Sequence, residues 1–395
     1  MLETLLRAHI GDEWRDVLDE LARARNWATS HDVVRLGKSL AELSAAYNDV
    51  TRAALSRPKR EWLGARLVFS FVRDVPKVTL AVREVVSRRA LALPSDRPLR
   101  VLDLGAGLGA SSWGLVRAFA LLGQQGRIEV DAIDTDRDAL DLNAALVRNV
   151  ARQGDVELVV HTGLVRTWSD VESRSYDVVL LGQVLSELDV ELSGEERVTK
   201  HATLVTSLLA QLESSGFLVI VEPALRATSR HLHKVRDAVL ANEHVSIHGP
   251  CVHRAGCPAL LRESDWCHED VDLALPQYLV PVARAAGLRY EGITFSYVIL
   301  STRGVASLPP TSAVYRVVSR AMISKGKREL HLCGYFAQGE TREVAATKVD
   351  RLDRDITPSN AAWDELCRGD LLEVDSPLNK NKPRVSRVVH LRLIR

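Results

Sequence analysis

The stretch VLDLGAGLGASSWG, from Val101 to Gly114, is a short apolar run that breaks into glycines and then continues with helical spacing. This pattern predicts a strand, a tight turn and the N-terminus of a helix. Gly105, Gly107 and Gly109 allow the chain to turn sharply and bring a ligand against main-chain amides, which a Cβ would obstruct. We therefore expect a cofactor-binding turn.

Two carboxylates accompany the turn. Asp103 lies two residues before the first glycine, where a carboxylate would repel a pyrophosphate but suit the ammonium of an amino-acid cofactor. Asp134 ends the apolar run IEVDAID, where an acidic residue can accept hydrogen bonds from both ribose hydroxyls. These positions favour S-adenosylmethionine over a dinucleotide. The alternative is a structural glycine turn, with Asp134 serving only as the N-cap of a helix over 136–149.

Short apolar runs alternate with helical segments between residues 99 and 222, which predicts an α/β fold with a parallel, doubly wound sheet. The runs are LRVLDL, IEVDAID, VELVVH, YDVVLLG and GFLVIVE. We expect the third run to end at His161 and Thr162, beside an adenine, and the fourth at Gly182 and Gln183, beside the reacting group. Two later runs, RYEGITF and SYVILST, should form an antiparallel pair that closes the sheet, as in class I (Rossmann-like) methyltransferases.

Composition shifts divide the chain into three predicted parts. Residues 1–94 read as a helical domain, and Pro94 and Pro98 mark a linker. Residues 95–303 form the methyltransferase-like domain, with a cysteine-rich insert at about 245–275. Pro309 and Pro310 precede short β-like stretches, so residues 304–395 should form a small β-rich domain, such as a barrel of the oligonucleotide-binding type.

The composition is that of an ordinary globular protein, with 46% hydrophobic residues and a net charge of +1. No apolar run approaches the length of a membrane span, and the acidic, amphipathic N-terminus is unlike an export signal, so we expect a cytoplasmic protein that does not bind membranes. Local basic clusters are usually solvated faces, but several of them fit a phosphate-contacting surface. The clusters are Arg57, Lys59 and Arg60; Arg83, Arg88 and Arg89; Arg226, Arg230, Lys234 and Arg236; and Lys380, Lys382, Arg384 and Arg387.

Three of the five cysteines crowd into the insert, in GPCVHRAGCPALLRESDWCHED. They are Cys251, Cys257 and Cys267, and Cys333 could supply a fourth ligand from the C-terminal part. Because no export signal favours disulfides, metal ligation is the leading interpretation. Four thiolates complete the ligand shell of zinc or of an iron–sulfur cluster.

The spacing does not decide between these metals. Zinc sites commonly contain C-x2-C pairs and ferredoxins another compact run, whereas here five and then nine residues separate the three cysteines. His253 and His268 are alternative ligands, and cysteines that bind no metal are the remaining interpretation. Cys367, in DELCRGD, is expected to be a free buried thiol.

The sequence resembles the methyltransferase-like assembly factors of the small ribosomal subunit, a family that includes mitochondrial methyltransferase-like protein seventeen and bacterial relatives. The resemblance rests on LSAAY at 43–47, WLGARL at 62–67, VLDLGAGLGASSW, YDVVLLGQVLSEL, VEP at 221–223, PC…CP…DWCH at 250–268 and LC at 332–333. It implies that Cys251, Cys257, Cys267 and Cys333 hold a [4Fe–4S] cluster rather than zinc. It also implies the small ribosomal subunit and its rRNA as partners.

Two functions follow from these patterns. The first is an rRNA methyltransferase that uses S-adenosylmethionine, with Gln183 and Glu187 as the candidate substrate-facing residues. The second is a ribosome assembly factor, a monomer off the ribosome, that keeps the cofactor fold and a metal site without catalysis. The cofactor motif favours the first. Enzymes that methylate an amine commonly hold it with an Asn/Asp-Pro-Pro-aromatic motif at the position after the fourth strand. This chain has GQVLSEL there and lacks the motif, which favours the second function.

Overall fold

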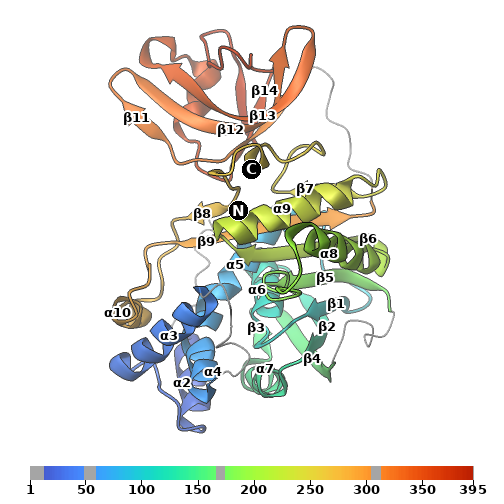
Figure 1. The fold of residues 1–395 in the computed structure, drawn as a ribbon, viewed down its shortest axis with the longest axis vertical. Coiled ribbons are helices and arrows are strands. Elements are labelled where there is room, and N and C mark those ends of the chain that lie inside the picture. The colour runs from blue at the N-terminus through green and yellow to red at the C-terminus, as the bar shows by residue number, and fades with distance from the viewer. Residues whose placement is uncertain (1–12, 49–58, 166–173, 304–312, 395) are drawn as a thin grey trace. The chain divides into compact units, whose positions relative to one another are not determined.

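The computed structural model describes residues 13–48, 59–165, 174–303 and 313–394 (Figure 1). It divides into two compact units, the first comprising Met1–Gly182 and Val271–Ile293 and the second Gln183–Asp270 and Thr294–Arg395. The division at residues 94 and 303 stays a prediction; Arg57, Pro309 and Pro310 lie outside the described residues. Across the described ranges, no helix is both long enough and apolar enough to cross a membrane.

The first unit begins with helices, as the spacing of apolar residues predicts. They are α2 (Glu13–Arg23), α3 (Val33–Asn48), α4 (Arg60–Ala65), a π-helical turn (Arg66–Ser70) and α5 (Phe71–Ser87). Trp14 packs edge-on against Trp113 of α6 (Ala110–Leu121), with ring centroids 4.8 Å apart. Thr79 of α5 donates to the Gly114 carbonyl at 2.9 Å. The early helices therefore share a core with the helix that follows the glycine turn.

The sheet of the first unit is parallel and doubly wound, as predicted. Its parallel strands are β1 (Leu99–Leu104), β2 (Gly126–Asp134), β4 (Val156–Leu164) and β5 (Tyr176–Gly182), in the order β4-β2-β1-β5 (Figure 1). A short strand, β3 (Arg152–Gln153), pairs antiparallel with β4. Helix α7 (Arg137–Val150) follows β2, and the unit also contains α10 (Val280–Ala285). Because β1 has β2 on one side and β5 on the other, the strand order reverses beside β1, where open α/β sheets bind ligands.

The prediction that the third run ends at His161 and Thr162 is wrong by two residues. Strand β4 continues to Leu164, which pairs with Asp134 at the end of β2. His161 and Thr162 lie inside the strand with exposed side chains. The extra pairing with β2 extends the strand through Gly163, where a sequence-based boundary would fall.

The second unit contributes antiparallel strands. They are β6 (Leu212–Pro223), β7 (Ser246–Gly249), β8 (Glu269–Val271) and β9 (Ile293–Ser301), accompanied by helices α8 (Gly194–Leu209) and α9 (Arg226–Leu240). Strand β9 pairs antiparallel with both β6 and β7. The expected hairpin of RYEGITF and SYVILST is therefore wrong, because Phe295 and Ser296 continue without a turn in one strand. The partner that completes the antiparallel pair, β7, comes from the insert.

A second, six-stranded sheet confirms that the C-terminal part is rich in β-structure. Its strands are β10 (Ala313–Val317), β11 (Met322–Ser324), β12 (Lys327–Gln338), β13 (Thr341–Leu352), β14 (Leu371–Val374) and β15 (Leu391–Ile394). The order is β11-β12-β10-β14-β15, and β13 pairs with β12. Tyr315, Phe336 and Trp363 are fully buried in its core. An oligonucleotide-binding barrel stays a prediction.

The close contact between α5 and α6 predicts the effect of a substitution at Gly114. A Cβ on Gly114 would lie 2.6 Å from the Val75 carbonyl oxygen, so Gly114→Ala must push the helices apart. We expect a loss of about 1–3 kcal/mol in unfolding free energy and a lower thermal midpoint by calorimetry. Gly194→Ala is the control, because no heavy atom lies within 4 Å of its added Cβ. Equal midpoints for the two variants would contradict the close packing.

Candidate functional site

The glycine turn after β1 requires glycine for conformational and steric reasons. Gly105, Gly107 and Gly109 have φ angles of 73°, 49° and 83°, in the left-handed region that side chains disfavour. A Cβ on Gly109 would also lie 2.6 Å from Oδ1 of Asn143. The Gly105 amide donates to the Ile133 carbonyl of β2 at 2.8 Å, which fixes the turn at the carboxyl ends of the two central strands.

Asp134 is bound to this turn and does not cap the following helix. Its Oδ2 accepts from the Gly107 amide at 2.7 Å, and its Oδ1 accepts from the Asp136 amide at 2.8 Å. The N-cap of α7 is Asp136, whose Oδ1 accepts from the Ala139 amide at 3.1 Å. The alternative in which Asp134 serves only as an N-cap is therefore wrong.

Asp103 has one satisfied and one unsatisfied carboxylate oxygen. The residue is fully buried, and its Oδ2 accepts from the Ser112 hydroxyl at 2.6 Å and the Ser112 amide at 3.2 Å. Its Oδ1 is buried and has no hydrogen-bond partner among the described residues. Burial raises the pKa of Asp103 to about 6 against the opposing bonds from Ser112. A buried, unsatisfied carboxylate oxygen suits a cationic donor.

Arg66 is a residue at the turn that the sequence reasoning missed. It begins the π-helical turn, and its Nη2 would lie 3.1 Å from a Cβ on Gly107. Its Nη1 lies 3.5 Å from Oδ2 of Asp136. Single π-helical turns inside α-helices occur frequently at functional sites. The motif WLGARL at 62–67 contains this arginine, but nothing local indicates that it reaches the glycines.

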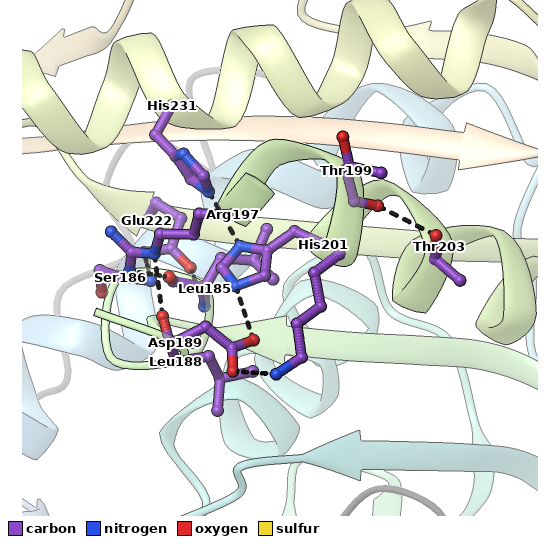
Figure 2. A network of polar contacts seen from close by, with 11 residues as sticks. Leu185, Ser186, Leu188, Asp189, Arg197, Thr199, His201, Thr203, Glu222 and His231 are labelled. Atoms are coloured by element: carbon purple, nitrogen blue, oxygen red, sulfur yellow. Dashed lines mark hydrogen bonds and ion pairs between the residues drawn. The ribbon is translucent and has the colours of Figure 1, made fainter. Parts of the chain in front are cut away.

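The loop after β5 is fixed through its main chain (Figure 2). Gln183, the first residue of the loop, has a φ of 63°, and its amide donates to the Val221 carbonyl at 2.7 Å. The amides of Leu185 and Ser186 donate to the two carboxylate oxygens of Glu222, at 2.8 and 3.2 Å. Glu222 is buried, and burial raises its pKa to about 7. Glu222 therefore has a structural role in holding the loop.

A second set of contacts fixes the far end of the same loop. The Arg197 guanidinium donates to the carbonyls of Leu185 at 2.7 Å and Leu188 at 2.9 Å. Asp189 accepts from Lys200 at 2.5 Å and lies 3.4 Å from Nε2 of the buried His201. Nδ1 of His201 lies 2.8 Å from Nε2 of His231, which extends the network to α9 (Figure 2).

The two candidate catalytic side chains lie on this fixed loop. Gln183 is half-buried and Glu187 is exposed. The Glu187 amide bonds to the Val184 carbonyl at 2.9 Å, inside the loop itself. Their roles toward a substrate stay a prediction.

All four predicted ligand cysteines lie in the second unit. Cys251 follows β7, Cys257 caps the 3-10 turn Pro258–Leu260, Cys267 precedes β8, and Cys333 lies in β12. The Cys257 amide donates to Oδ2 of Asp237 at 3.0 Å. Different elements thus bring sequence-distant cysteines into one part of the unit.

The four thiols influence one another electrostatically. Burial, together with the charge of the neighbouring Cys251, raises the pKa of Cys257 to about 12. Desolvation likewise raises the pKa of Cys267, and Cys257, Cys251 and Cys333 all add to that rise. The thiols are therefore close enough for their ionised forms to repel one another.

The structure does not present these cysteines as a formed metal site. Within the described ranges, no group of three or more His, Cys, Asp or Glu side chains is arranged to hold a metal ion. His253 directs Nε2 toward the Cys333 sulfur at 3.5 Å, and His268 stacks on Trp266 at 5.4 Å. The expectation that Cys367 is buried is wrong: it is exposed where the chain turns, and its amide donates to Asp370 at 2.8 Å.

Two predicted basic clusters contain buried arginines. Arg236 is 1% exposed and Arg83 is 3% exposed, so neither can contact a phosphate on the surface. Arg230 donates to the carbonyls of Ala259, Arg262 and Asp265 within the insert, at 2.7 to 2.9 Å. Arg230 and Arg236 of the α9 cluster therefore bind the insert, whereas Arg226 and Lys234 of the same cluster are exposed.

Comparison with known proteins identifies a family. Residues 67–366 match the model of the family described as mitochondrial small ribosomal subunit Rsm22. This match confirms the resemblance to a small-subunit methyltransferase-like family. No significant match was found among curated proteins.

Solved methyltransferase structures give weaker similarities. A putative class I S-adenosylmethionine-dependent methyltransferase from Listeria monocytogenes is 15% identical, with a TM-score of 0.39 over 78% of this chain and 91% of that chain. A plantazolicin methyltransferase solved in complex with SAH is 11% identical, with a TM-score of 0.36 over 68% of this chain and 99% of that one. A putative RNA methyltransferase from Pyrococcus horikoshii is 13% identical, with a TM-score of 0.31 over 58% and 84%. At these scores the fold assignment rests on the strand order described above.

The buried Glu222 predicts a pH dependence of stability. The pKa of Glu222 is about 7 in the folded state, whereas the ordinary value, 4.5, applies to the unfolded chain. The folded state therefore binds the proton of Glu222 more tightly than the unfolded state does. Its contribution is fully present below pH 4.5 and is lost as the pH rises to about 7, by up to about 3 kcal/mol. Denaturant unfolding of the wild type and Glu222→Gln across this range should show the extra slope only in the wild type. Parallel curves would contradict this role.

Proposed function

Because the chain belongs to the mitochondrial small ribosomal subunit Rsm22 family, we propose that it is a small-subunit assembly factor. In this proposal the first unit binds S-adenosylmethionine, the second unit holds a four-cysteine metal centre, and the rRNA of the small subunit is the partner. The observation that supports cofactor binding best is the unsatisfied Oδ1 of Asp103, at the strand-order reversal beside β1.

The residues of the glycine turn fit S-adenosylmethionine. Asp103 would accept a hydrogen bond from the cofactor ammonium, which would satisfy its orphaned oxygen. Asp134 would accept from the ribose hydroxyls, and Gly105 and Gly107 leave room for the ligand beside the main chain. The other proposed contacts are His161, Thr162, Gly109 and Gln183.

The donor set of the second unit fits a thiolate-bound metal. We propose that Cys251, Cys257, Cys267 and Cys333 hold a [4Fe–4S] cluster, with zinc as the alternative. Desolvated thiols that raise one another's pKa gain from a cationic centre, because metal binding stabilises the thiolates. When bound, a cluster supplies one-electron redox chemistry. The side chains must close around the metal, because the structure shows no preformed ligand arrangement among the described residues.

A second candidate function is methylation of small-subunit rRNA. The cofactor motif favours it, with Gln183 and Glu187 as substrate-facing residues. The fixed loop after β5 favours assembly without catalysis, since Glu222 and Arg197 bind its main-chain amides and carbonyls. We propose a cytoplasmic protein, monomeric off the ribosome, whose phosphate contacts weaken steeply with salt.

Cofactor binding predicts a selective effect of Asp103→Asn. The neutral amide removes the charge opposite the ammonium, so affinity for S-adenosylmethionine and S-adenosylhomocysteine should fall roughly tenfold to a hundredfold. Methylthioadenosine, which has ribose but no ammonium, should bind the variant as it binds the wild type. Asp134→Asn is the matched control and should weaken all three ligands. Calorimetric titration measures these affinities; equal losses for all three ligands in Asp103→Asn would contradict the assigned contact.

The same variant separates the two functions in cells. Cells that lack the protein should accumulate immature small subunits, and Asp103→Asn, once shown not to bind the cofactor, should restore assembly. Mapping of small-subunit rRNA modifications in both strains measures methylation. If the variant restores neither assembly nor a modification that the wild type installs, catalysis is the function.

The metal centre predicts the composition of the purified protein. Protein prepared anaerobically should contain about four irons and four sulfides per chain, and Cys257→Ser should lose them. Cys367→Ser is the control, because this exposed cysteine lies outside the proposed ligand set. Stoichiometric zinc without sulfide would replace the cluster by the zinc alternative, and protein without either metal would overturn the centre.

A further inference from the structure

Helix α9 holds the cysteine insert through arginine side chains. The side chain of Arg236 is 0% exposed. Its Nη1 donates to the Ala255 carbonyl at 2.6 Å and its Nη2 to the His253 carbonyl at 2.5 Å. These carbonyls belong to the loop between Cys251 and Cys257. A fully buried guanidinium thus holds the main chain that carries two of the cysteines.

Arg316, in strand β10, is a second buried arginine that binds a cysteine segment. It is 3% exposed, and its Nε donates to the carbonyl of Pro250, the residue before Cys251, at 2.9 Å. Its Nη1 donates to the Gly369 carbonyl at 2.5 Å. In the pairing of β10 with β12, Arg316 lies directly opposite Cys333. The two arginines therefore contact the segments of three of the four cysteines.

The positive charges of these arginines lie beside the cysteine segments. Arg236 binds two carbonyls between Cys251 and Cys257, and Arg316 is paired opposite Cys333. Asp237 offsets part of this charge, because its Oδ1 lies 2.5 Å from Nη1 of Arg236 and its side chain is 27% exposed. Buried cations are costly unless an anionic group compensates them. Four thiolates around a metal supply that negative charge.

We propose that Arg236 and Arg316 are charge-compensating positioning residues, which hold the cysteine loops and place two positive charges beside a thiolate-ligated metal group. This inference rests on the proposed metal centre. The added positive charge stabilises the thiolates, so the metal is retained more firmly. It also stabilises the more negative, reduced state of a cluster, so the reduction potential is raised.

Arg230 provides the matched control. Like Arg236, it lies on α9 and donates to main-chain carbonyls of the insert, including those of Ala259 and Arg262. The carbonyls that it binds lie outside the loop between Cys251 and Cys257 that Arg236 holds. Loss of Arg230 therefore removes contacts with the insert but leaves the bonds to that loop in place.

The test compares Arg236→Gln, Arg316→Gln and Arg230→Gln in the full chain, purified anaerobically. Redox titration followed by electron paramagnetic resonance should show that each of the first two variants lowers the reduced-to-oxidised ratio at fixed potential about tenfold, or about 59 mV for a one-electron couple. Both should also release metal to a chelator faster. Arg230→Gln should keep the wild-type potential. Arg236→Lys, which keeps the charge, should recover most of the shift even though it cannot reproduce both carbonyl bonds.

The outcomes distinguish this inference from the metal centre itself. If the wild type holds a cluster and its reduction potential is unchanged in Arg236→Gln, Arg316→Gln and Arg230→Gln, the charge role is overturned but the metal centre is not. If the wild type holds zinc, the rate at which each variant releases zinc to a chelator is the test. Slower release from Arg230→Gln than from Arg236→Gln and Arg316→Gln supports the charge role, and equal rates overturn it. A wild type without metal overturns both. If Arg236→Gln does not fold, the potentials of Arg236→Lys and Arg316→Gln decide.

Discussion

The hydrogen bond from the Gly107 amide to Asp134 is the contact on which the first unit's ligand site depends. It joins the turn after β1 to the end of β2, where the strand order reverses. A carboxylate offers about four acceptor positions, and the amides of Gly107 and Asp136 use two. Asp134 can therefore hold the turn in place and still accept hydrogen bonds from a ribose. The same side chain can define the shape of the site and bind the ligand.

The cysteine insert of the second unit has little regular secondary structure. Its carbonyls cannot all be satisfied by strand pairing, and buried carbonyls need donors. Arginines supply them: Arg230 binds the carbonyls of Ala259, Arg262 and Asp265, and Arg236 binds those of His253 and Ala255. Arg254 of the insert in turn binds the carbonyls of Leu240 and Asn242, at and just beyond the end of α9. The arginines that bind these carbonyls therefore also place positive charge near the cysteines.

The features that the sequence predicted correctly are those set by local pattern. The apolar run of β1, the glycines with positive φ and the helix of α6 depend on neighbouring residues alone. The errors concern contacts between distant segments. Pairing with β2 extends β4 beyond Thr162, and pairing with β9 makes a strand of part of the insert. The sequence placed Arg236 in a basic cluster but could not show that its side chain is buried.

The surroundings of the cysteines also could not be predicted from local sequence. Their sequence spacing left zinc and an iron–sulfur cluster open, and no local pattern indicated that Arg316 lies opposite Cys333. Leu366 and Cys367 are adjacent in the sequence, but Leu366 is buried in the core and Cys367 is exposed. The chain turns shortly afterwards, at Gly369, which has a positive φ angle. Residue type alone therefore identified the candidate ligands, and their electrostatic surroundings required the fold.

The loop after β5 bears most directly on whether a methyl group is transferred. An acceptor amine must be oriented by oxygen atoms that are free to bind it. Here the Leu185 and Leu188 carbonyls accept from Arg197, and the Leu185 and Ser186 amides donate to Glu222. Substrate would have to displace bonds to a guanidinium and to a buried carboxylate, each stronger than an ordinary neutral hydrogen bond. A loop built this way is suited to hold its shape, which favours an assembly factor over an enzyme that transfers a methyl group.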